Sequence, residues 1–309
     1  MVQDSGIHQS NREEVIRKNS LKAWFLAARP KTLAAGATPV VVASALAFHD
    51  GVFRWLPALI CLAFAMLAQV ISNFANDYFD YIKGSDNEER LGPKRAVAEG
   101  WISPKVMLSV TFALCVLNSL LGLTLLFYGG WFLILVGVAV VVFALAYSGG
   151  PYPLAYHGWG DVCVFIFFGI VPVGFTYYVQ TQQWTLSTTI CGIAVGLVII
   201  NILVANNYRD RFSDARSGKN TTIVLFGERF GRYFYLLNGI VAVLCCQYFW
   251  LENSIWAAVC PMFYLVFHFM TWRTMIRIGE GRELIAVLEQ SARNVLIFGL
   301  ALSAGLVLK

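Results

Sequence analysis

Charged side chains are scarce in this chain. Asp, Glu, Lys and Arg together make up 13% of its 309 residues, whereas roughly 25% is usual in soluble domains. Hydrophobic residues make up 58%, which is more apolar surface than a soluble chain of this length could bury in one core. The composition excludes an ordinary soluble globular protein and indicates one that is embedded in a membrane.

Also missing are the motifs of several common enzyme classes. The sequence has no G-x-x-x-x-G-K-[ST], no H-E-x-x-H and no G-x-S-x-G. Its seven cysteines lie within apolar stretches and form no C-x-x-C pair, so we expect buried thiols rather than disulfides or a metal site. The first 30 residues carry charges and no apolar core region, so we expect no cleavable signal peptide.

What the chain does contain is nine apolar stretches, each long enough to cross the roughly 30 Å of a bilayer as a helix. Backbone groups in hydrocarbon must be satisfied within the protein, and the alternating pattern of barrel strands is absent. The sequence predicts an all-α integral membrane protein of about nine transmembrane helices, with a polar tail, 1–20, before a single transmembrane domain, 21–309. The predicted spans are 32–48, 55–78, 106–128, 131–148, 161–179, 187–208, 233–250, 254–272 and 290–308.

The positive charges are distributed very unevenly between the two sides of these spans. With the N-terminus in the cytoplasm, 21 of the 23 Lys and Arg residues fall on the cytoplasmic side, and only Arg54 and Lys309 lie outside it. Cytoplasmic loops of membrane proteins are enriched in positive charge, so we expect this orientation in the cell inner (cytoplasmic) membrane. The basic face suits anionic lipid or phosphorylated substrates, and nucleic-acid binding is not expected because the basic loops lie against the membrane.

The ends of the second and sixth predicted spans are rich in Asn and Asp. In the sixth span, Asn206, Asp210 and Asp214 follow an i, i+4, i+8 spacing, which places three oxygen-bearing side chains on one face of a helix. Long loops, 79–105 and 209–232, are predicted after the two spans. Both acidic ends are therefore expected on the cytoplasmic side.

The second span carries a matching pattern in Asn76 and Asp80. The third place of its column falls on Gly84, and Asp86 lies two residues beyond. A polar stripe leads up to this cluster, and polar residues in a membrane helix are costly unless they face a cavity or a partner. We therefore expect a central cavity in the helix bundle. The stripe consists of Gln69, Ser72, Asn73, Asn76 and Asp80.

Two acidic clusters on one side of the membrane predict a metal-assisted reaction. One such cluster is more simply explained by helix capping and ion pairing, but that explanation is weaker for two similar ones. Grouped carboxylates repel each other, and a divalent cation removes the conflict. Mg²⁺ prefers carboxylates together with substrate phosphate oxygens. Basic residues that could bind the remaining phosphate oxygens are interleaved with the clusters: Lys83, Arg90, Lys94, Arg95, Arg209, Arg216 and Lys219.

A transporter or channel is the main rival from another class, because polar stripes in membrane helices also mark ion pathways. A transporter should place ionisable groups near the middle of the membrane and reach both faces. The charges of this chain gather at one interface, which favours an enzyme. A membrane scaffold without a site is a further alternative.

At its two acidic clusters the chain resembles the UbiA superfamily of intramembrane aromatic prenyltransferases, whose nine helices carry Asp-rich motifs at the cytoplasmic ends of helices 2 and 6. The second family motif falls on Asn206, Asp210 and Asp214. In the first motif, N-x-x-x-D-x-x-x-D, the third acid is replaced by Gly84, and Asp86 or Asp77 is the candidate substitute.

Within the superfamily the chain is most similar to the 1,4-dihydroxy-2-naphthoate prenyltransferases of menaquinone synthesis. The 4-hydroxybenzoate branch typically carries a Lys-Arg loop after helix 4, whereas 147–157 contains neither Lys nor Arg. A UbiA-type enzyme with another aromatic acceptor, such as homogentisate, chlorophyll or haem precursors, is the alternative. The segments that carry the similarity are 29–33, 76–80, 83–86, 91–93, 150–154, 158–161, 209–210 and 218–221.

The resemblance implies a Mg²⁺-dependent transfer of a polyprenyl group from polyprenyl diphosphate to the naphthoate, with loss of CO₂ and diphosphate, giving demethylmenaquinone. It implies that Asn76, Asp80, Asn206, Asp210 and Asp214 bind or orient the metal. The diphosphate-binding candidates are Lys83, Arg95, Arg209 and Lys219. Additional substrate-site candidates are Asn73, Asp77, Asp86, Tyr147 and Asp161. Asp161 either binds the ring hydroxyl of the acceptor or caps its helix, and Tyr147 either contacts substrate or packs.

Overall fold

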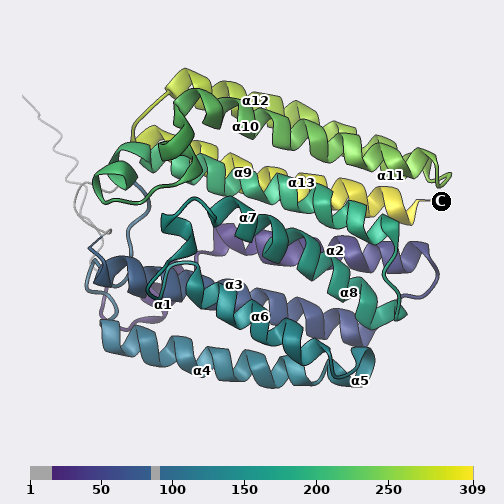
Figure 1. The fold of residues 1–309 in the computed structure, drawn as a ribbon, viewed down its shortest axis with the longest axis horizontal. Helices are drawn as coiled ribbons and strands as arrows, with labels where there is room; N and C mark the ends of the chain where they lie inside the picture. Colours follow the sequence, from purple (N-terminus) through teal and green to yellow (C-terminus); the bar gives the residue numbers. More distant parts are fainter. Residues whose placement is uncertain (1–15, 85–90, 309) are drawn as a thin grey trace, which may run out of the picture.

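The computed structural model describes residues 16–84 and 91–308, which fold into a bundle of helices (Figure 1). The longer helices are α2 (Leu33–His49), α3 (Trp55–Ile82), α4 (Pro104–Leu123), α6 (Leu133–Ala146), α8 (Val171–Thr181), α9 (Leu186–Arg216), α10 (Thr222–Cys246), α12 (Tyr264–Ile278) and α13 (Ile285–Val307). Shorter helices are α1 (Leu21–Ala28), α5 (Leu126–Gly129), α7 (Gly160–Phe165) and α11 (Ile255–Val259). The remaining turns are η1 (Pro30–Thr32), η2 (Leu154–Tyr156), η3 (Ile166–Ile170), η4 (Gln247–Trp250), η5 (Cys260–Phe263) and η6 (Arg282–Leu284).

The predicted all-α membrane architecture is confirmed, and every predicted span is helical. Within the described residues, seven helical stretches are long and apolar enough to cross a membrane. An eighth forms if α1 and α2, which meet at an angle of 58°, are counted as one broken span. Helix α6 is apolar but has 14 residues, so the total of nine spans stays a prediction. The orientation of the bundle and the boundary at residue 20 between the polar tail and the transmembrane domain also stay predictions.

Several helices begin where the sequence supplies a capping side chain. Ser103, Thr185 and Thr221 stand just before α4, α9 and α10, and each accepts a hydrogen bond from a backbone N–H of the first turn. Such caps satisfy N–H groups that have no partner within the helix. The starts of these helices are therefore fixed by local sequence.

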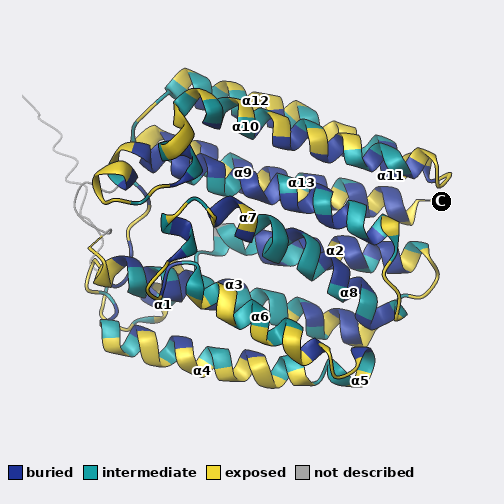
Figure 2. Cartoon of the chain, viewed as in Figure 1, coloured by how far each residue is buried: buried dark blue, intermediate teal, exposed yellow. Residues whose placement is uncertain are grey.

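Helix α9 lies at the centre of the bundle, whereas α4 lies at its edge (Figure 2). In the most apolar window of each helix, 67% of the residues are buried in α9 but only 11% in α4. Glycines on both sides permit a close approach of α9 to the segment around η3: a Cβ atom on Gly169 would lie 2.5 Å from the Cα atom of Gly196, and one on Gly196 would lie 2.9 Å from the carbonyl oxygen of Phe165. Small residues four apart allow membrane helices to pack in this way.

The predicted loop 209–232 is wrong over most of its length. Helix α9 continues to Arg216, and α10 begins at Thr222 with a break at Gly227, whose φ of 85° is non-helical. The polar residues beyond position 208 bond to neighbouring side chains at the end of the bundle, so leaving the apolar stretch does not end the helix. Asp210 and Asp214 therefore stand on the same helix as Asn206, as the spacing of the three residues predicted.

Candidate active site

A cavity of about 950 Å³ lies inside the bundle. Most of its wall is apolar and comes from α2, α3, α4, α6, α8 and α9. Its polar end contains Asn76, Asp80, Arg95, Asn206 and Lys219. The predicted central cavity is thus present. Asn76 and Asp80 at the end of α3 and Asn206 of α9 line it, whereas Asp210 and Asp214, on the following turns of α9, do not.

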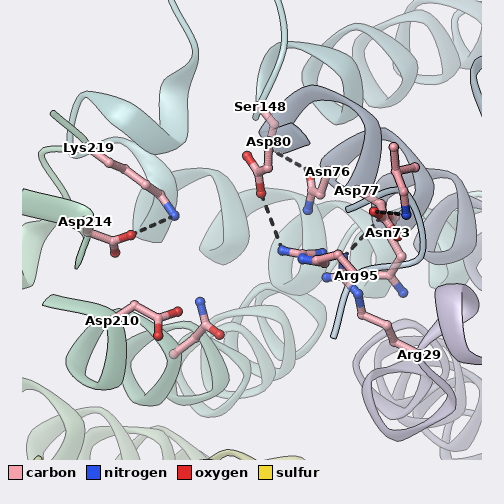
Figure 3. A network of polar contacts seen from close by, with 12 residues as sticks. Arg29, Asn73, Asn76, Asp77, Asp80, Arg95, Ser148, Asp210, Asp214 and Lys219 are labelled. Carbon is pink, nitrogen blue, oxygen red and sulfur yellow. Dashed lines mark hydrogen bonds and ion pairs between the residues drawn. The ribbon is translucent and has the colours of Figure 1, made fainter. Parts of the chain in front are cut away.

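The first cluster stands on the last turns of α3 (Figure 3). Asp80 is 7% exposed; its Oδ2 accepts from Arg95 Nη2 at 3.4 Å and its Oδ1 from the Tyr156 hydroxyl at 3.2 Å. The Ser148 hydroxyl donates to Asn76 Oδ1 at 2.7 Å. Side chains from two later segments therefore hold both predicted metal-binding residues of this helix.

The third place of the first motif lies outside the helix. Helix α3 ends at Ile82, and Gly84 follows with φ +70°, a left-handed conformation that glycine adopts without strain. A side chain at this place would leave the face that carries Asn76 and Asp80. Asp86, a candidate substitute for the missing acid, lies outside the described residues.

Asp77, the other candidate substitute, anchors a loop. It is 1% exposed, and its two carboxylate oxygens accept the backbone N–H groups of Ala96 and Val97 at 3.0 and 3.2 Å. The residue just before this pair is Arg95, whose guanidinium reaches Asp80. Asp77 thereby fixes the backbone that presents Arg95 to the cluster.

Asn73 connects the polar stripe to the N-terminal helices. Its Nδ2 donates to the carbonyl of Ala28 at 2.9 Å and to Thr32 Oγ1 at 3.4 Å, and its Oδ1 accepts from Gln69 Nε2 at 3.2 Å. Arg29, in a left-handed conformation between α1 and η1, donates to the Asn73 carbonyl at 3.4 Å. These bonds fix the bend between α1 and α2 against α3.

The second cluster stands on the end of α9 and is organised by Arg209. This residue is 1% exposed; its Nε and Nη2 donate to the two oxygens of Asp210 at 2.8 and 2.6 Å, and Nη2 also donates to Asn206 Oδ1 at 2.8 Å. The predicted diphosphate ligand Arg209 is therefore bound to two predicted metal-site residues. The buried arginine balances the charge of the buried carboxylate.

Asp214 pairs with the other predicted cation of this half of the site. Its Oδ1 lies 3.6 Å from Lys219 Nζ, and its backbone carbonyl accepts from the Lys219 N–H at 2.8 Å. Gly218, with φ +72°, reverses the chain between them. Figure 3 shows the Lys219 ammonium group directed into the space between the two clusters.

Lys83 follows the end of α3 and contacts the segment after α6. Its Nζ donates to the Ser148 carbonyl at 2.5 Å and lies 4.7 Å from the centre of the Tyr156 ring. Partial burial lowers the pKa of Lys83 from its usual value, and the carboxylate of Asp80 opposes that shift. Lys83 is thus held near the cluster, yet its side chain reaches solvent.

Tyr147 and Asp161 are the remaining substrate-site candidates within the described residues. Tyr147 lines the cavity. Asp161, in the first turn of α7 and 6% exposed, accepts a hydrogen bond from the Thr222 hydroxyl at 2.6 Å. This bond ties the start of α7 to the start of α10, which favours the structural explanation of Asp161 over binding of the acceptor.

Tyr156 is a residue of this site that the sequence interpretation missed. It lies in η2, within the Gly- and Pro-rich segment after α6, where nothing in the local pattern marks one aromatic residue above its neighbours. Two stretches that carry the family resemblance, 150–154 and 158–161, lie on either side of Tyr156 and were the available signal. Only the folded chain brings its hydroxyl to Asp80.

The donor set fits a hard divalent cation. Asn76, Asp80, Asn206, Asp210 and Asp214 offer oxygen atoms alone, as Mg²⁺ requires. Among the described residues, however, no three His, Cys, Asp or Glu side chains form a ready metal site. Mg²⁺ is usually bound by one or two carboxylates together with substrate phosphates, so the arrangement fits an ion that binds with a diphosphate.

Several known proteins are similar to this chain. The profile of the UbiA prenyltransferase family matches residues 37–287. The 1,4-dihydroxy-2-naphthoate octaprenyltransferase of Haemophilus influenzae is 37% identical over 76% of this chain and 79% of that protein. The protein of the same description from Mycobacterium tuberculosis is 35% identical over 93% and 97%.

Among solved structures, a UbiA homolog from Archaeoglobus fulgidus bound to GPP and Mg²⁺ has the same fold. The TM-score is 0.64 with 15% sequence identity, and the alignment covers 91% of this chain and 99% of that one. At this identity the likeness supports the helical architecture alone.

Proposed function

The chain belongs to the UbiA prenyltransferase family, and we propose that it transfers a polyprenyl group from polyprenyl diphosphate to 1,4-dihydroxy-2-naphthoate. The protein is a multi-pass membrane prenyltransferase. In the proposed reaction the allylic C–O bond breaks, and the ring carbon that carries the carboxylate forms the new C–C bond. Carbon dioxide and diphosphate leave, and demethylmenaquinone results in its reduced form.

The observation that carries this proposal is an apolar cavity whose polar end is lined by Asp80, Asn206 and Lys219. The acidic clusters to which these residues belong are paired with cations. An isoprenoid chain is as apolar as a lipid tail and fits the apolar wall, whereas a diphosphate needs cations and metal ligands. A reactive allylic cation also needs protection from bulk water, which a helix-lined cavity gives. One substrate with an apolar tail and a charged head matches both parts.

The chain's own residues would exchange partners when the substrate binds. Asp80, Asp210 and Asp214 are each paired with a cation, namely Arg95, Arg209 and Lys219. Mg²⁺ held by these carboxylates and by Asn76 and Asn206 would neutralise the diphosphate as the C–O bond breaks. The displaced cations, together with Lys83, would then pair with diphosphate oxygens.

The naphthoate acceptor is supported by the segment after α6 and by the names of the relatives. Residues 147–157 include no Lys or Arg, so no cation of this segment binds a carboxylate. A benzoate acceptor that keeps its carboxylate gains from a fixed cation, but a strong ion pair would stabilise a naphthoate against losing CO₂. The relatives described above are named for the naphthoate reaction.

We place the reaction at the cytoplasmic side of the inner membrane. The basic residues around the acidic clusters support this placement through the enrichment of positive charge in cytoplasmic loops. Polyprenyl diphosphate would have its head group at this interface, with its tail extending along the apolar cavity at the depth of the bilayer.

The test is product analysis with purified protein, Mg²⁺, a polyprenyl diphosphate and a panel of aromatic acceptors. With carboxyl-labelled 1,4-dihydroxy-2-naphthoate, one labelled CO₂ should be released per prenyl group transferred, and 4-hydroxybenzoate should be a poor substrate. Retention of the label in the lipid product, or a preference for 4-hydroxybenzoate, would reject the naphthoate acceptor.

A further inference from the structure

Tyr156 contacts both acidic clusters through three different groups. Its hydroxyl donates to Asp80 Oδ1 at 3.2 Å. Its ring contacts two ammonium groups, those of Lys83 at 4.7 Å and Lys219 at 5.7 Å from the ring centre. Its backbone carbonyl accepts the N–H of Asn220 at 3.0 Å.

These contacts form a continuous path between the two halves of the site. Asp80 stands on α3, and Asp214, which pairs with Lys219, stands on α9. The Asn220 bond fixes the short segment between α9 and α10 that carries Lys219. A single residue of η2 thus contacts a carboxylate of one cluster and the cation of the other.

The ring also accounts for the presence of two lysines beside one site. Two ammonium groups near one site repel, and the negative face of an aromatic ring attracts both. The Lys83 bond to the Ser148 carbonyl adds a second attachment. Both cations are therefore held beside the acidic clusters before any anion binds.

We propose that Tyr156 is a positioning residue that sets the two acidic clusters and two of their lysines for one diphosphate. The proposal rests on the proposed function. The hydroxyl orients the Asp80 carboxylate, which keeps further lone pairs for a metal ion. The ring holds Lys83 and Lys219 at the place where the diphosphate oxygens arrive.

Two substitutions separate the hydroxyl from the ring. Tyr156→Phe removes the bond to Asp80 and keeps the ring, whereas Tyr156→Leu removes both. Neither removes the backbone bond to Asn220. Tyr152→Phe is the matched control, because Tyr152 is exposed in the same segment and stacks on His157, with ring centres 3.7 Å apart.

The readout is the affinity of the full-length protein for the Mg²⁺ complex of inorganic diphosphate, measured by titration calorimetry. Loss of a hydrogen bond to a metal-binding side chain typically lowers metal affinity about 10- to 100-fold. We expect a loss of about tenfold in Tyr156→Phe, a larger loss in Tyr156→Leu and none in Tyr152→Phe. In turnover assays the KM for polyprenyl diphosphate should rise in both Tyr156 variants, and the KM for the aromatic acceptor should not.

The possible results distinguish the role of the Tyr156 hydroxyl, the role of its ring and the proposed function. Wild-type affinity in Tyr156→Phe would overturn the role of the hydroxyl, and equal affinities in the two Tyr156 variants would overturn the role of the ring. If Tyr156→Leu fails to fold, Tyr156→Phe still decides the hydroxyl, because it differs from the wild type by one oxygen atom. A wild-type protein that does not bind the complex would contradict the proposed function itself.

Discussion

The guanidinium group of Arg209 donates to both carboxylate oxygens of the residue next to it, Asp210, at 2.8 and 2.6 Å. Neighbouring residues of a helix point in different directions, so Arg209 must fold back along α9 to make this pair. The side chain of Arg209 is 0% exposed and that of Asp210 8%. Asp210 is therefore both a predicted metal ligand and the charge partner of a buried arginine.

From this pair we predict that Asp210→Asn lowers stability as well as activity. Removing one partner of a buried ion pair leaves an uncompensated charge and typically costs about 3–5 kcal/mol. Asp214→Asn is the control, because its partner Lys219 keeps 18% of its side chain exposed. Both variants should lose most of their turnover, but only Asp210→Asn should show a clearly lower unfolding midpoint in detergent. Equal midpoints would contradict the role of the Arg209 pair.

We also predict an absolute need for a divalent cation. The three carboxylates of the two clusters, Asp80, Asp210 and Asp214, would repel a diphosphate unless a metal ion joins them. Turnover should disappear in excess EDTA and return when excess Mg²⁺ is added. Undiminished turnover in EDTA would show that the acidic clusters do not work through a metal.

A third prediction concerns the loop that Asp77 anchors. Asp77→Ala removes the acceptor of two backbone N–H groups, so the segment that carries Arg95 should loosen. We expect faster tryptic cleavage at Arg95 and a rise of about tenfold or more in the KM for polyprenyl diphosphate, as loss of a charged hydrogen bond implies. Glu99→Ala is the control, since Glu99 forms an exposed pair with Lys94 at 3.6 Å, and such pairs contribute little. Equal cleavage rates in the two variants would contradict the proposal that Asp77 anchors this loop.

The orientation of the bundle gives a fourth prediction. In a background without the native cysteines, Cys at Glu99 or Ser217 should react with an impermeant thiol reagent only from the cytoplasmic side. Cys at Asn253, which is exposed in the turn between η4 and α11 at the opposite end of the bundle (Figure 1), should react from outside. Labelling of Glu99→Cys or Ser217→Cys from outside intact cells would overturn the predicted orientation.

Much of the fold follows from local properties of the chain. The length of each apolar stretch determines that 32–48, 55–78 and the other predicted spans are helical, because a backbone in hydrocarbon must bond to itself. The positions of Asn206, Asp210 and Asp214 along one helix face also follow from their spacing alone. These properties require no knowledge of how the helices pack.

The sequence was less informative where a polar segment bonds to distant residues. The apolar stretch ends at position 208, and its end predicts a loop, yet the structure continues α9 to Arg216, as the spacing of Asn206, Asp210 and Asp214 indicates. Arg211 in this extension donates to the carbonyl of Gly279 at 3.0 Å, which lies 68 residues away along the chain. Such a contact stabilises the helical turn, and composition does not reveal it.

The tertiary structure alone decided which groups meet in the site. Tyr156 and Asp80 are separated by 76 residues, and the direction of each side chain depends on how α3, η2 and α9 pack. The sequence supplied Asp77 as an acid beside Asn76, but only the folded loop shows that its oxygens face the N–H groups of Ala96 and Val97. Residue types and helical faces are local properties, whereas a hydrogen bond forms only between groups that the packed helices bring within about 3 Å.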